Sequence, residues 1–86
     1  MKLIQNKNYY ELPRMDIYAP NGTRVMFDSL TAGYPYDQEK IKLAGLVVGR
    51  IYTVNFTVVH GSSTDVYLNG FLGFFNSVCF GQLKVV

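Results

Sequence analysis

The sequence predicts a mainly β protein, a small and strongly bent antiparallel barrel of five or six strands with one short helix near residues 37–45. Apolar and β-branched residues recur in short alternating runs, which is the pattern of half-buried strands. Clusters of glycine, asparagine and serine separate these runs, as expected for tightly connected antiparallel strands. Residues 51–83 carry one formal charge, at Asp65, so the core is expected to draw mainly on this half of the chain.

Composition favours one folded domain over residues 1–86, with an irregular N-terminal segment (1–13) followed by the barrel (14–86). The hydrophobic content of 49% is too high for a disordered chain. One cysteine, Cys79, excludes an internal disulfide, and one cysteine with one histidine cannot supply a four-ligand zinc site. We therefore expect no metal and no cofactor.

The first residues contain no apolar run of the length found in signal peptides. Residues 66–83 are uncharged, but glycine, asparagine and serine residues interrupt them, and these would leave polar groups unsatisfied in lipid. We expect a cytoplasmic protein that does not contact a membrane.

The first element expected is a hairpin. Asn21 and Gly22 lie between two β-prone runs, and both residue types tolerate the positive φ of a two-residue turn. The alternation in the second run predicts that Val25 and Phe27 share one face.

A short helix is expected next. Asp37 is a suitable N-cap for a helix over residues 38–44, and Gly45 is a suitable terminator. Ile41 would then face the barrel.

Residues 51–60 form the longest predicted strand, whose core face is expected to carry Tyr52, Val54, Phe56 and Val58. After a turn at 61–63, the alternation of Thr64, Val66 and Leu68 predicts a second strand. A further hairpin signal follows at residues 69–70. Two apolar segments, 71–75 and 78–80, are expected to flank a tight turn at residues 76–77, and residues 83–86 to add a last short strand.

At this length we favour a Src-homology-3-like barrel over a sandwich. The motifs Val-Gly-Arg-Ile-Tyr-Thr-Val (48–54), Ser-Ser-Thr-Asp-Val-Tyr-Leu (62–68) and Phe-Phe-Asn-Ser-Val-Cys-Phe (74–80) resemble those of small phage- and prophage-encoded proteins. The resemblance covers residues 22–80. It implies a Src-homology-3-like fold and a viral accessory role inside the host cell, and it supplies no catalytic residues.

The residues themselves do not indicate an enzyme. Cys79 lies between Val78 and Phe80, the setting of an inert buried thiol. The six carboxylates are spread singly, and no phosphate-binding glycine motif with its lysine is present. We expect no catalytic residues.

Candidate residues for ligand or partner binding are Tyr34, Tyr36, Arg50, Ser62, Ser63 and Asn76. The two tyrosines flank Pro35 and could stack on a base or a peptide, or simply cover an open barrel end. The serines could hold a phosphate, or form a plain turn. Arg50 could meet a charged ligand, or be a solvated residue at a strand end.

A surplus of apolar side chains near the C-terminus predicts a homo-oligomer or a docking surface, the alternative being burial in the core. The predicted interface residues are Phe71, Leu72, Phe74 and Phe75.

Taken with the resemblance, these observations lead us to expect a non-enzymatic phage accessory protein that acts by binding. It would inhibit or sequester a host factor, either a defence protein or a small nucleotide signal. One alternative is a nucleic-acid-binding barrel that uses the tyrosines with Arg24, Arg50 and the lysines, although the basic residues are scattered. Another is a structural or assembly component of a virion.

Overall fold

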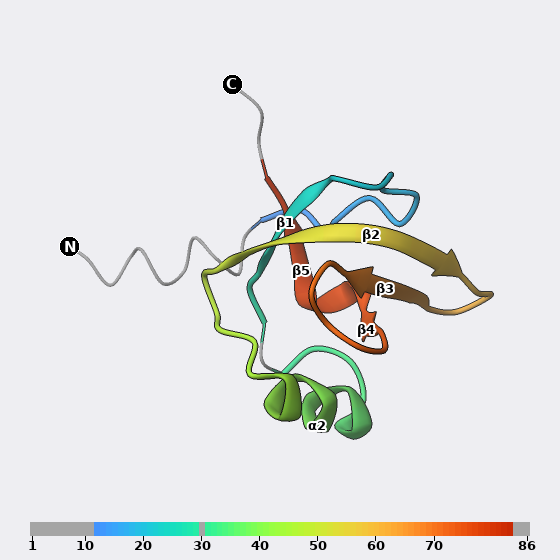
Figure 1. Ribbon diagram of the computed structural model, residues 1–86. Coiled ribbons are helices and arrows are strands. Elements are labelled where there is room, and N and C mark those ends of the chain that lie inside the picture. Colours follow the sequence, from blue (N-terminus) through green and yellow to red (C-terminus); the bar gives the residue numbers. More distant parts are fainter. Residues whose placement is uncertain (1–11, 30, 84–86) are drawn as a thin grey trace.

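The strands of this protein form one curved antiparallel sheet, shown in a computed structural model that describes residues 12–29 and 31–83 (Figure 1). The five strands lie in the order β4-β3-β2-β1-β5. In chain order the elements are β1 (Arg24–Phe27), α2 (Pro35–Ala44), β2 (Ile51–Val59), β3 (Thr64–Leu68), β4 (Phe75–Asn76), the 3₁₀ turn η1 (Ser77–Cys79) and β5 (Phe80–Gln82).

The prediction of a mainly β antiparallel fold with one short helix is confirmed. The edge strands β4 and β5 are joined by η1 and are not neighbours in the sheet, so the barrel is not closed. The likeness to Src-homology-3 barrels stays a prediction. Of the last predicted strand, Leu83 follows the end of β5, and residues 84–86 lie outside the described part of the chain, as do residues 1–11.

The predicted hairpin across Asn21 and Gly22 is wrong. A turn does occur there, with Gly22 at φ 95°, but residues 15–18 form no strand beside β1. Strand β1 pairs with β2 and β5 instead. Met15 and Ala19 are buried in the core, so the segment before the turn is held by side-chain packing rather than by a ladder. Val25 and Phe27 do share the core face.

The helix begins earlier than predicted. Tyr34 is the N-cap in an extended conformation, and Pro35 takes the first helical position, where its missing N–H costs nothing. Asp37, predicted as the N-cap, lies inside the first turn, and its carboxylate accepts a hydrogen bond of 2.8 Å from the Tyr34 N–H. Gly45 ends the helix at φ 75°, as predicted, and Ile41 is buried.

The predicted core face of β2 is only partly right, because a β-bulge interrupts the strand. Val54 pairs with Leu68, yet Phe56 pairs with Tyr67, so Asn55 is an extra residue. Beyond the bulge the alternation is inverted. Val54 is fully buried, whereas Phe56 is 46% exposed and Val58 lies on the same outer face.

The prediction for β3 is right, whereas the prediction for the turn at residues 76–77 is wrong. The core face of β3, with Thr64, Val66 and Leu68, is confirmed. The tight turn expected at residues 76–77 is instead the end of β4 followed by η1, which the Asn76 side chain caps by accepting from the Val78 N–H.

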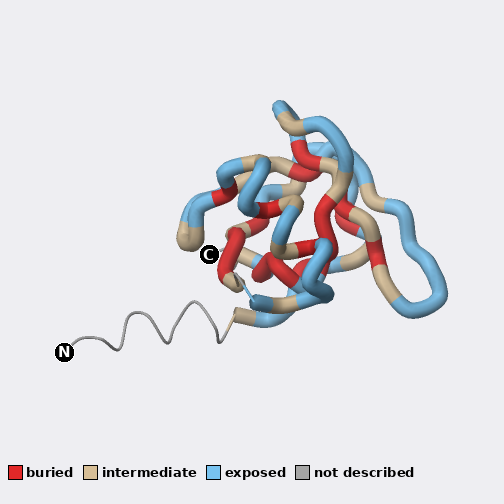
Figure 2. Tube along the Cα trace, turned by 90° about the horizontal axis from the view of Figure 1, so that it is seen from below, coloured by how far each residue is buried: buried red, intermediate tan, exposed pale blue. Residues whose placement is uncertain are grey.

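One core joins every strand to the helix, and it forms the buried centre in Figure 2. Its buried apolar members are Met15, Ala19, Val25, Phe27, Ile41, Leu46, Val54, Val66, Leu68, Phe75, Cys79 and Phe80. The turn that joins β2 to β3 extends beyond this centre and is exposed.

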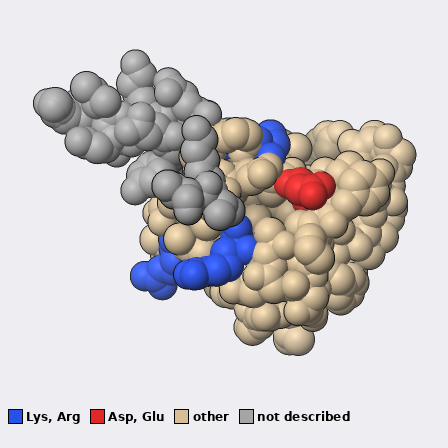
Figure 3. All heavy atoms as spheres, turned by 90° about the horizontal axis from the view of Figure 1, so that it is seen from above, with Lys and Arg blue, Asp and Glu red and all other residues tan. Residues whose placement is uncertain are grey.

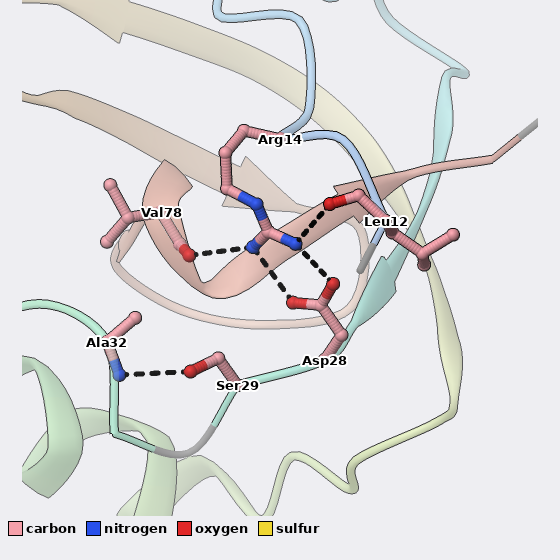
Figure 4. Close-up of polar contacts among 6 residues, drawn as sticks. All are labelled: Leu12, Arg14, Asp28, Ser29, Ala32 and Val78. Carbon is pink, nitrogen blue, oxygen red and sulfur yellow. Dashed lines mark hydrogen bonds and ion pairs between the residues drawn. The ribbon is translucent and has the colours of Figure 1, made fainter. Parts of the chain in front are cut away.

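An ion pair between the partly exposed Arg14 and the buried Asp28 lies at the edge of the core. Asp28 is fully buried, and the Arg14 guanidinium donates to both of its carboxylate oxygens, at 2.9 Å for Oδ1 (Figure 4). The same guanidinium donates to the carbonyls of Val78 and Leu12, both at 2.9 Å. Gly81 packs so closely that a Cβ there would lie 2.5 Å from Asp28 Oδ2. Arg14 therefore ties the segment before β1 to the end of the sheet.

Candidate binding surface

The two tyrosines that flank Pro35 lie together at the start of α2. Pro35 fixes the extended conformation of Tyr34 and begins the helix, which brings Tyr36 to the same side. The rings stack with centroids 5.5 Å apart and planes at 12°, and they are 53% and 62% exposed. The tyrosines thus offer an exposed stacked pair, and its use in binding stays a prediction.

Asn76 has a role within the fold instead of the predicted role in ligand binding. Its amide donates to Asp37 Oδ2 at 3.1 Å, and its Oδ1 accepts from the Val78 N–H at 3.2 Å. The side chain is buried, so it joins β4 to α2 and is not available to a ligand.

Arg50 and the two serines do not form one site with each other. Arg50 is exposed and precedes β2, whereas Ser62 and Ser63 follow it (Figure 1). A strand of nine residues separates them, or about 30 Å at the rise of an extended chain. The Ser63 carbonyl accepts a 2.8 Å bond from the His60 N–H, as in a simple hairpin turn. A single small ligand cannot contact both ends of β2.

The predicted interface residues divide between core and surface. Phe75 is buried, and Phe71 is half-buried with its ring edge-on to Phe75 and to Tyr52, at 6.0 and 5.6 Å. Both phenylalanines therefore contribute to the core; Phe75 is too deeply buried for the predicted interface, whereas the prediction for Phe71 stays untested. Leu72, in contrast, is 99% exposed.

Phe74 is partly exposed, and its ring makes a cation–π contact with a nearby lysine. The Lys40 ammonium lies 3.2 Å from the centroid of the Phe74 ring and donates to the Phe74 carbonyl at 3.1 Å. The Phe74 ring also contacts that of Tyr67, and the Tyr67 ring stacks on Phe56 with centroids 4.2 Å apart. An aromatic row, Phe74–Tyr67–Phe56, thus crosses the outer face of the sheet.

A cleft of about 500 Å³ opens between α2 and the loop before β4. Lys40, Leu43 and Ala44 line it from the helix, and residues 70–75 line it from the loop and β4. Leu43 and Leu72, at its walls, are 87% and 99% exposed. Leu43 was missed from the sequence, although its position three residues after Lys40 places it on the same side of the helix.

Cys79 is buried and its thiol lies 3.6 Å from the Ala32 carbonyl oxygen. Burial, together with the carboxylates of Asp37 and Asp28, raises the pKa of this thiol to about 12. The thiol therefore stays protonated at neutral pH and is a poor nucleophile.

A family model, rather than an individual protein, matches this chain. No curated protein and no solved structure matches the chain. Within the described residues, the single helix is too short and too polar to cross a membrane. The model of a phage protein family, described as Bacteriophage T4 protein Y07B, matches residues 16–85. The expectation of a small phage-encoded protein is therefore confirmed, and this chain belongs to the Bacteriophage T4 protein Y07B family.

Proposed function

We propose that this chain is a phage accessory protein that binds a host protein through the cleft between α2 and the loop before β4. The observation that carries the proposal is the exposure of Leu43 and Leu72, at 87% and 99%, on the walls of this cleft. Large apolar side chains gathered around a groove are typical of surfaces that a partner covers.

The lining of the cleft favours a protein segment over a nucleotide. Lys40 is the only cation among the described residues that line it. Its ammonium already interacts with the Phe74 carbonyl and ring. A phosphate would have to displace these contacts, whereas an apolar side chain would add to the surface of Leu43 and Leu72. The partner is therefore expected to insert apolar anchors, as amphipathic helices do in grooves.

Binding without catalysis is also supported by the polar groups. Cys79 is buried and protonated. His60 contacts Asp65 through Nε2 at 2.9 Å, and within the described residues no serine or threonine hydroxyl is hydrogen-bonded to its ring. A nucleophile activated by a neighbouring base, which acyl transfer needs, is thus not assembled in this part of the chain.

Affinity capture from lysates of infected host cells tests the proposal. The bait is the tagged chain, beside a Leu43→Asp/Leu72→Asp variant and a Tyr18→Asp control, which changes a 71% exposed side chain elsewhere. We expect a host protein that the wild type and the control retain and the double variant loses. Retention by all three would contradict the assignment of the cleft. A stoichiometric small molecule seen by native mass spectrometry, with no protein captured, would instead indicate sequestration of a nucleotide.

Single-stranded nucleic acid is a second candidate, favoured by the stacked and exposed pair Tyr34 and Tyr36. The charges favour it less, because on the face seen in Figure 3 Lys and Arg side chains occur in separate places and most of the surface is uncharged. Binding of a labelled oligonucleotide that weakens steeply with salt and is lost in Tyr36→Ala would support this candidate. Salt-independent binding, or none, would exclude it.

A further inference from the structure

Among the described residues, one edge of the second half of β2 is left unpaired. Strand β1 pairs with β2 over residues 51–53 only. At the next residue, the Val54 N–H donates to the Thr23 carbonyl and the Val54 carbonyl accepts from the Gly22 N–H. The amide of Asn21 covers Asn55 by donating to its carbonyl at 3.1 Å. From residue 56 to residue 59, no described strand pairs with this side of β2. Exposed edges of this kind can pair with another chain.

The pairing with β3 determines which backbone groups face the open edge. The His60 N–H donates to the Ser63 carbonyl, so His60 points its backbone groups toward β3. Antiparallel strands alternate in this respect, so Val58 and Phe56 also point toward β3. The N–H and C=O groups of Thr57 and Val59 therefore point outward, away from β3.

Beyond the β-bulge at Asn55, the side chains of β2 do little to protect this edge. Strand β2 contains no charged residue and no proline. Phe56, Val58 and Val59 flank the edge and are 46%, 37% and 38% exposed. The side chains beside these backbone groups are thus apolar and accessible.

We propose that a second copy of this chain pairs antiparallel along this edge, with the two-fold axis at Val58. In this register Thr57 of each copy exchanges backbone hydrogen bonds with Val59 of the other. The two Val58 residues form a non-hydrogen-bonded pair with their Cα atoms about 4.5 Å apart. Phe56 lies opposite His60 of the second copy, and a continuous sheet runs through both copies.

The length of the edge favours a second copy over a longer peptide. The open edge ends at Asn55, where the Asn21 side chain covers the backbone. In the proposed register Gly61 of the second copy lies at this point, where the partner chain turns back toward its own β3. A Cβ at Gly61 would have no atom of the same copy within 4 Å, so this turn is exposed. A longer extended peptide would continue into Asn21.

The charges are compatible with self-pairing. The acidic and basic side chains of β2, β3 and the turn between them are Asp65 and His60, which contact each other within one copy at 2.9 Å. Uncharged Val58 lies at the axis, so the register places no like charges opposite each other. This inference does not depend on the proposed function, because the cleft beside α2 is lined by other residues.

Sedimentation equilibrium of the full chain tests the pairing. We expect a dimer for the wild type and a monomer, with half the mass, for Val58→Lys, because two ammonium groups would meet at the axis. Val47→Lys, which changes a 46% exposed valine outside the strands, is the matched control and is expected to stay dimeric. A monomeric wild type, or a Val58→Lys variant that remains a dimer, would overturn the proposal.

Cross-linking tests the register separately. We expect Val58→Cys to form a covalent dimer under mild oxidation, since cysteines opposite each other at a non-hydrogen-bonded position can form a disulfide. The buried Cys79 is present in every variant and is not expected to react. Val47→Cys should remain uncross-linked. Failure of Val58→Cys to cross-link while the protein is dimeric would overturn the register.

Discussion

The Arg14–Asp28 ion pair shows how much of this fold depends on single polar residues. Asp28 is fully buried, and the guanidinium is the charged partner of its carboxylate. An unpaired buried carboxylate is costly, but water can partly replace the Arg14 side chain, which is 41% exposed. We therefore expect Arg14→Ala to lower the free energy of unfolding by about 2 kcal/mol, less than the loss of one partner from a fully buried pair. Urea denaturation measures this loss. Arg24→Ala, an exposed arginine on β1, is the control, and an equal effect of both changes would contradict the role of the ion pair.

Cys79 gives the stability a specific dependence on pH. Its folded pKa is raised to about 12 from the ordinary 9.0. Above pH 9 the unfolded chain loses the thiol proton while the folded chain keeps it. The stability that the protonated thiol contributes is therefore complete below pH 9 and is lost as the pH rises towards 12.

Between pH 8 and pH 10 we therefore expect the wild type to lose about 1.4 kcal/mol more stability than Cys79→Ala. Urea unfolding of both proteins at the two pH values gives this double difference, in which the other titrating groups cancel. Parallel losses in the two proteins would show that the thiol ionises alike in both states.

At the scale of the elements, the bulge at Asn55 determines which residues of β2 support the core. Val54 is fully buried, whereas Phe56 is nearly half exposed and stacks on Tyr67. We expect Val54→Ala to cost about 2 kcal/mol. Phe56→Ala, although it removes a larger side chain, should cost about 1 kcal/mol. Urea unfolding compares the two, and the reverse order would mean that Phe56 lies in the core.

The same two strands show what alternation in the sequence can and cannot predict. The core face of β3 follows directly from its alternation, because no residue interrupts it. The alternation of β2 misleads after Val54, because the extra residue Asn55 shifts the pattern. Asn55 is held by Asn21, which lies far away in the sequence, so a local pattern cannot reveal this contact.

In the candidate surface, too, local features could be predicted from the sequence and contacts between distant segments could not. The sequence could place Tyr34 and Tyr36 at one candidate surface, because Pro35 fixes the local backbone between them, but it did not predict that the two rings stack on each other. The cleft beside Leu43 depends on how α2 packs against the loop before β4, which no local signal encodes. For the same reason, Phe75 could not be assigned to the core from its apolar segment alone.

At the scale of the whole molecule, the single core predicts cooperative unfolding. Every strand and the helix contribute to one buried cluster, so no described element has a separate core that would stabilise it alone. We expect urea transitions followed by tyrosine fluorescence and by far-ultraviolet circular dichroism to have the same midpoint. Separate midpoints would show that the β2–β3 hairpin unfolds independently.

The contact between the beginning and the end of the sheet determines when this protein can fold during its synthesis. The Met15 N–H donates to the Phe80 carbonyl, and the Gln82 N–H donates to the Pro13 carbonyl. Cys79 and Phe80 are fully buried members of the core. A nascent chain cannot complete its core until residues 79–82 have left the ribosome. Before then it exposes the almost uncharged segment from β2 to β4, so we expect the nascent chain to depend on chaperones until residues 79–82 have emerged.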